Sequence, residues 1–87
     1  MYTRIKYWKD NYAMDDSDDK RAVQNFMECE TREVVSALRN ELSQLLAGNY
    51  NADSLQVLIG RGRPLKHGSY EEWAKLMLQW MAGYGKV

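Results

Sequence analysis

A long stretch without glycine or proline, residues 17 to 47, constrains the fold of this chain more than any other feature. Its apolar residues recur every three or four positions, the spacing that places side chains on one face of an α-helix. The pattern predicts either one central helix, about 45 Å long, or two helices bent near Glu30, and we favour the single helix. Gly48 and Asn49 follow as a C-terminal stop. The apolar positions are Val23, Phe26, Met27, Val34, Ala37, Leu38, Leu42, Leu45 and Leu46.

A second helix is predicted to begin after Ser69 and to end near Gly83 and Gly85. Ser69 and Glu72 have the spacing of a capping box, in which serine and glutamate satisfy backbone N–H groups at the start of a helix. We expect the apolar face of this helix to fold back on the central helix as a structural element. That face comprises Tyr70, Trp73, Leu76, Met77, Trp80 and Met81.

Two shorter segments are less decisive. Residues 2–8 alternate between two faces with period two, which predicts a short strand or an extended arm. Residues 53–59 are too few for periodicity to separate helix from strand, so a minor two-stranded element from 2–8 and 55–60 fits the pattern. Residues 11–19 form a predicted loop, with Asp16 or Ser17 as a helix N-cap. The fold class is therefore mainly α, a single small domain over residues 1–87.

Charge is balanced over the whole chain but unevenly distributed. Twelve basic and twelve acidic residues cancel, so only local patches can attract a charged partner. Residues 1–9 carry three bases and no acid, residues 10–19 carry five aspartates and no base, and residues 61–67 carry three bases and no acid. The single cysteine excludes an internal disulfide, and no apolar run suggests a membrane span or signal peptide. We expect a cytoplasmic protein.

The basic segment Gly60-Arg-Gly-Arg-Pro-Leu-Lys-His-Gly68 predicts an exposed loop. Its core, Arg61-Gly62-Arg63-Pro64, resembles the tetrapeptide of AT-hook-like and nucleoid-silencer DNA readers. In those proteins an extended Arg-Gly-Arg lies along a narrow A/T-rich minor groove. This resemblance implies DNA contact through the loop and the basic N-terminal segment. The alternative is a turn whose arginines pair with acids of the same chain. The candidate nucleic-acid-binding residues are Arg61, Arg63, Lys66, Arg4 and Lys6.

A longer pattern over residues 55–85 resembles a C-terminal accessory segment of phage- and plasmid-type primase–helicase replication proteins. It consists of Gly62-Arg63-Pro64, a spacer, Gly68-Ser-Tyr-Glu-Glu-Trp-Ala74 and a helix that ends before Gly83-Tyr-Gly85. The Gly-x-x-x-x-Gly-Lys-Ser/Thr motif of the ATPase motor is absent from the chain. The resemblance therefore implies an accessory domain of mobile-element origin, without catalytic residues.

The remaining motifs do not predict chemistry. One histidine and one cysteine cannot form a metal cluster or a nucleophilic pair, so we expect no enzyme activity, metal, cofactor or small-molecule substrate. The central apolar stripe is longer than one C-terminal helix can cover, which predicts a protein partner or a homodimer. The sequence thus predicts a protein-binding module, with a DNA-binding accessory domain as the alternative. The candidate protein-binding residues are Met27, Val34, Trp80 and Met81.

Overall fold

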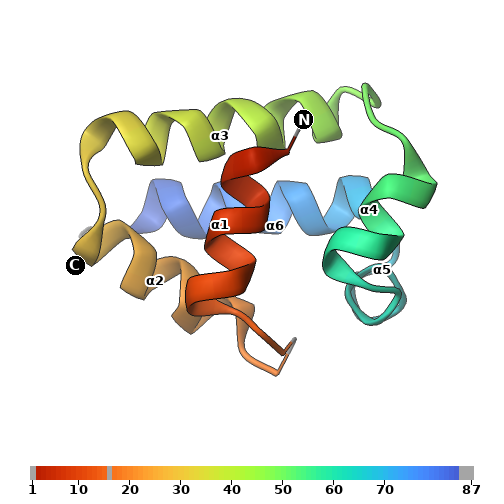
Figure 1. Cartoon of the computed structure of the whole chain (residues 1–87), viewed down its shortest axis with the longest axis horizontal. Coiled ribbons are helices and arrows are strands. Elements are labelled where there is room, and N and C mark those ends of the chain that lie inside the picture. The colour runs from red at the N-terminus through yellow and green to blue at the C-terminus, as the bar shows by residue number, and fades with distance from the viewer. Residues whose placement is uncertain (1, 16, 85–87) are drawn as a thin grey trace.

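The computed structural model describes residues 2–15 and 17–84, which form six helices and no strand. Helices α3 and α6 make the most extensive contact. Helix α1 crosses in front of both, while α4 and α5 lie together at one end (Figure 1). The Cα radius of gyration is 11.8 Å, close to the value of about 12 Å expected for one domain of this length. The helices are α1 (Thr3–Tyr12), α2 (Asp19–Cys29), α3 (Arg32–Leu46), α4 (Ala52–Ile59), α5 (Gly62–His67) and α6 (Tyr70–Gly83).

The predicted mainly α class is confirmed, but the central helix is two helices rather than one. The chain becomes extended at Glu30, and Thr31 caps α3 by accepting a hydrogen bond from the backbone N–H of Val34 at 3.3 Å. At the other end of this stretch Asp18, rather than Ser17, caps α2, and Asp16, the other predicted cap, lies outside the described residues. The break lets α2 turn back toward α6, so the apolar stripe is divided between two directions.

Glu30, where the helix breaks, makes side-chain contacts with α1. Its carboxylate accepts hydrogen bonds from the hydroxyls of Tyr7 and Tyr12 in α1, at 2.8 and 2.5 Å. Both rings also pack edge-on against Phe26. The residue that interrupts the apolar pattern therefore fixes α1 across the junction of α2 and α3.

Residues 3–12 form a helix, so the predicted strand or extended arm over 2–8 is wrong. Tyr2 precedes the helix in a left-handed conformation and supplies no side-chain cap. Glu41 of α3 takes that role, because its carboxylate accepts from the backbone N–H groups of Arg4 and Ile5 at 3.0 to 3.2 Å. Ile5 and Trp8, three residues apart, are fully buried. The helix is thus stabilised by a cap and a packing surface that are remote in sequence.

The segment after α3 is also helical, which excludes the minor two-stranded element over the described residues. Gly48 has a positive φ of 86°, and Asn49 N–H bonds back to the carbonyl of Gln44 at 2.9 Å, the arrangement that ends helices at glycine. Asn51 then caps α4 by accepting from the backbone N–H of Ser54 at 3.0 Å. Leu55 and Ile59, one helical turn apart, bury the inner face of α4.

The C-terminal helix begins after Ser69 as predicted, and its buried face also includes Ala74, which the prediction left out. Ser69 caps α6 by accepting from the backbone N–H of Glu72 at 3.1 Å. Trp73, Met77 and Met81 are buried, whereas Tyr70, Leu76 and Trp80 are half-buried at the edges of the face. The buried residues of α6 and those of α1, α2, α3 and α4 form one core. Its fully buried large members are Trp8, Trp73, Phe26, Ile5, Leu38, Leu42, Leu45, Leu55, Met77, Met81 and Val23.

Glu41→Ala should destabilise the protein through α1. The change leaves two N–H groups at the start of α1 without their acceptor, and losing a cap or a charged hydrogen-bond partner costs about 1–3 kcal/mol. Urea denaturation measures the loss. Glu28→Ala, at an exposed position of α2, is the matched control and should change stability by no more than about 0.5 kcal/mol. Equal effects from the two variants would contradict the cap.

Alkaline pH should weaken a second polar contact. Tyr50 donates its hydroxyl hydrogen to Glu71 of α6 at 2.5 Å, and this bond, with desolvation, raises the pKa of Tyr50 to about 12. A raised folded-state pKa means that the bond stabilises fully below pH 10.0, the ordinary value, and is lost as the pH rises through about 12. The free energy of unfolding should therefore fall less steeply between these values in Tyr50→Phe than in wild type. Tyr84→Phe serves as the control, and a slope unchanged in Tyr50→Phe would argue against the contact.

Candidate functional site

Arg63, the second arginine of the basic motif, is buried with its side chain in an ion pair. It is 2% exposed, and its Nε and Nη2 groups donate to the two carboxylate oxygens of Asp19 at 2.8 and 3.0 Å. Nη1 donates to the carbonyl of Ile59 at 2.8 Å, and Nη2 also donates to the carbonyls of Ala13 and Asp15 at 3.0 and 3.1 Å. The planar guanidinium thus binds a carboxylate and three carbonyls from three parts of the chain.

Two tryptophans enclose this ion pair. Trp73 donates its indole N–H to Asp19 at 2.9 Å, and the Arg63 guanidinium carbon lies 5.5 Å from the Trp8 ring centroid. The two indole rings lie 6.0 Å apart. The Trp8 indole N–H is buried without a hydrogen-bond partner among the described residues. A buried carboxylate with three N–H donors and a cation over an aromatic ring form a satisfied polar centre inside an apolar core.

This geometry corrects the expectation that residues 60–68 are an exposed loop with two available arginines, and for Arg63 it bears out the alternative, pairing with an acid of the same chain. Residues 62–67 form α5, and Pro64 lies in its first turn, where no N–H is needed. Arg63 points into the protein, so it is not available to a DNA groove in this fold. Arg61 is exposed, and the side-chain oxygen of Gln56 accepts from its Nε and Nη2 at 3.0 and 3.1 Å in the amide orientation that satisfies both groups. Arg63 is therefore a buried structural residue, whereas Arg61 lies at the surface.

The other predicted nucleic-acid-binding residues lie on two separate elements. Lys6 of α1 is exposed and paired with Asp10 at 2.7 Å, and Arg4 is half-buried beside it. Lys66 of α5 is exposed and lies 3.4 Å from the carbonyl of Ser17. The burial of Arg63 interrupts the basic cluster that the sequence suggested.

Of the four predicted protein-binding residues, one belongs to the buried core and three lie at its edge. Met81 is 2% exposed, so its expected role on a surface is corrected to a packing role. Met27, Val34 and Trp80 are half-buried and pack against the core, with the Trp80 ring 6.2 Å from that of His67. The central stripe is covered in large part within the single chain, because Val23, Phe26, Leu38, Leu42 and Leu45 are fully buried, whereas Leu46 at its end is 43% exposed.

The most exposed apolar side chains lie elsewhere, at positions that the sequence analysis did not single out. Met14 is 81% exposed, Val57 is 88% exposed and Leu65 is 82% exposed. Val57 could have been found from the sequence if 53–59 had been read as a helix, because it lies two residues from both Leu55 and Ile59 and so faces away from them. Met14 lies within the aspartate run, where no periodicity marks it.

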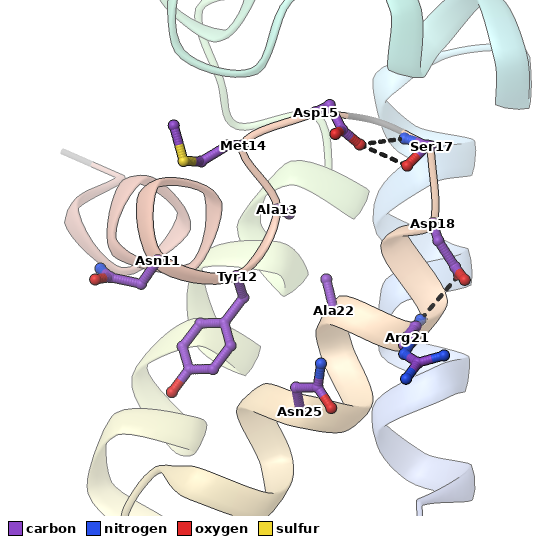
Figure 2. Close-up of a pocket in the computed structure, with 10 residues that line it drawn as sticks. All are labelled: Asn11, Tyr12, Ala13, Met14, Asp15, Ser17, Asp18, Arg21, Ala22 and Asn25. Carbon is purple, nitrogen blue, oxygen red and sulfur yellow. Dashed lines mark hydrogen bonds between the residues drawn. The ribbon is translucent and has the colours of Figure 1, made fainter.

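Met14 stands on a ridge between two hollows. We call residues 13–15 the Met14 ridge; Met14 and Asp15 line both hollows. The first groove, about 370 Å³, lies between this ridge and α2 (Figure 2). The second groove, about 350 Å³, lies between the ridge and the end of α4. The first is lined by Asn11, Tyr12, Ala13, Met14, Asp15, Ser17, Asp18, Arg21, Ala22 and Asn25. The second is lined by Lys9, Met14, Asp15, Val57, Leu58, Ile59, Gly60, Gly62 and Arg63.

Hydrogen bonds from Arg63 and from Ser17 hold the Met14 ridge in place. Arg63 binds the carbonyls of Ala13 and Asp15, the residues on either side of Met14. The Asp15 carboxylate accepts from the hydroxyl and the backbone N–H of Ser17 at 2.6 and 3.0 Å, and these bonds hold its pKa below the ordinary value. The ridge thus presents an exposed, flexible side chain on a backbone that is fixed by a buried cation.

Comparisons of the chain with models of known protein families, with curated proteins and with solved structures find no match. Among the described residues, no group of three or more histidine, cysteine, aspartate or glutamate side chains is placed to hold a metal ion. No helix within residues 2–15 and 17–84 has the length and apolar character needed to cross a membrane. The site must therefore be interpreted from its own chemistry, which is that of exposed apolar side chains bordered by charges.

The two arginines of the motif should differ sharply in their effect on stability. Arg63→Ala leaves Asp19 buried without its counter-charge, which costs about 3–5 kcal/mol. Arg61→Ala removes an exposed side chain and should cost no more than about 0.5 kcal/mol. Urea denaturation of both variants checks the difference, and similar midpoints for the two would contradict the buried role of Arg63.

Proposed function

We propose that this protein is a non-enzymatic binding module that contacts another protein through the Met14 ridge and its two grooves. The observation that carries the proposal is the pair Met14 and Val57, whose side chains are 81% and 88% exposed and line the same groove. An exposed apolar patch next to a concave surface is typical of protein-interaction sites. Methionine is suited to such a site because its flexible, polarisable side chain adapts to different partners.

The fixed backbone of the ridge supports the same function. Ordering a mobile loop on binding costs free energy, and a loop that is already held avoids much of this cost. Arg63 supplies that order through two carbonyl bonds on either side of Met14. The basic motif therefore contributes to binding indirectly, by positioning an apolar surface.

Three further expectations from the sequence accompany this proposal: the cellular location, the origin of the protein and a DNA-binding role. The exposed thiol of Cys29 fits a reducing compartment, which favours a cytoplasmic location. The primase–helicase resemblance suggests an accessory role in a phage or plasmid system. A DNA-binding role through Arg61 and Lys66 is less well supported than protein contact, because the third cation of that segment is buried in an ion pair.

Site-directed photo-crosslinking tests the proposal. A benzoylphenylalanine introduced at Val57 or at Met14, in cells that encode this chain, should give a discrete protein adduct. The same group at Gln79, an exposed position of α6 that lines neither groove, is the matched control. An adduct at both groove positions and not at Gln79 supports the proposal, and an adduct with a second copy of the chain identifies a homodimer. The same adduct from all three positions, or no adduct from the grooves, contradicts it.

A further inference from the structure

Two carboxylates beside the Met14 ridge have no counter-ion among the described residues. Asp19 is paired with Arg63, and Asp10 is paired with Lys6. Asp15 and Asp18 are exposed and line the first groove, and neither forms an ion pair with another described residue. Their hydrogen bonds come from uncharged donors, Ser17 and the backbone N–H of Arg21. These two carboxylates therefore keep their charge at the groove.

The cations near the grooves do not cancel this charge completely. Among the residues that line it, the first groove has one guanidinium, that of Arg21, against two carboxylates. The Lys66 ammonium lies outside this lining, 3.4 Å from the carbonyl of Ser17. In the second groove Lys9 lies 3.8 Å from Asp10, a carboxylate that also binds Lys6. The side chains that line the first groove therefore carry more acids than bases, and the second groove is close to neutral.

We infer that the segment bound on this surface is basic and apolar: a stretch of a partner protein in which lysine or arginine lies close to a large apolar side chain. The apolar side chain occupies the second groove, against Met14, Val57 and Leu58. The cation lies in the first groove, where Asp15 and Asp18 accept its hydrogen bonds. The two parts of the segment meet across the ridge, because Met14 and Asp15 border both grooves. This inference rests on the proposed docking function and specifies the chemistry of the partner.

Three short synthetic peptides test the inference directly, with the ¹⁵N-labelled protein observed by NMR. One contains lysine and leucine, one contains glutamate and leucine, and one contains lysine and serine. The lysine–leucine peptide should bind most tightly, and it should shift the amide signals of residues 11–15, 17–25 and 57–60. The lysine–serine peptide lacks the apolar anchor and should bind about tenfold more weakly, the effect of leaving one large apolar side chain unburied. Tighter binding by the glutamate–leucine peptide would overturn the inference, and so would shifts confined to other surfaces.

Matched variants separate the two contacts. Val57→Ser should weaken the lysine–leucine peptide about tenfold, whereas Leu46→Ser, an exposed apolar position outside both grooves, should not. Asp15→Asn with Asp18→Asn removes charge while keeping side chains that can accept the Ser17 and N-cap bonds. This double variant should weaken binding by up to about fivefold per charge and flatten its salt dependence. Glu33→Gln, at an exposed position of α3, is its control. Unchanged affinity in the double aspartate variant would overturn the assignment of the cation to the first groove.

The crosslinking experiment distinguishes failure of this inference from failure of the docking function. Mass spectrometry of the adduct formed at Val57 gives the sequence of the partner segment. A segment rich in lysine or arginine near an apolar residue supports the inference. An acidic segment, or a nucleic-acid adduct, overturns it. An acidic protein segment leaves the docking function intact, whereas the absence of any adduct removes the function itself.

Discussion

The ion pair between Asp19 and Arg63 is the constraint on which the fold depends. A charge pair inside a protein is costly unless its hydrogen-bonding groups find partners, so the segments that supply those partners must lie around it. The Asp19 carboxylate receives the guanidinium and the indole N–H of Trp73, and Arg63 also binds three backbone carbonyls. These partners come from α2, α4, α5, α6 and the connection that follows α1. Five elements therefore depend on one polar centre for their relative positions.

Short helices need this kind of support. Isolated helices of fewer than about twelve residues are marginal in water, and α4 and α5 have 8 and 6 residues. Their stability comes from tertiary contacts, as with α1, whose first N–H groups bind Glu41. Glu30 and Glu71 similarly accept tyrosine hydroxyls from other parts of the chain. The apolar core supplies most of the burial. These carboxylates add specific contacts between segments that are remote in sequence.

The parts of the fold that could be predicted are those with local causes. The Ser69 cap and the inner face of α6 depend on neighbours within one or two turns, and they were found from spacing alone. The helical state of residues 3–12 depends on Glu41, and the end of α2 coincides with tyrosine contacts to Glu30, so spacing within either segment could not reveal them. Arg63 and Asp19 are separated by 44 positions, and no local pattern distinguishes a buried arginine from an exposed one two residues away. The candidate site could not be predicted from the sequence for the same reason, because the exposure of Met14 is a property of the folded chain.

Several residues that fix the fold near Met14 also border the proposed recognition surface. Of the aspartates at 10–19, Asp19 is a buried counter-ion, Asp18 is a helix cap and Asp15 closes a turn. Each role fixes the backbone near Met14, and two of the three carboxylates remain exposed beside the grooves. A rigid backbone that carries an adaptable side chain combines a low ordering cost with tolerance of partner shape. Substitution of Asp19, which lines neither groove, would therefore alter the proposed docking surface without touching it, because Arg63 is the only buried cation among the described residues that can hold the carbonyls of the ridge.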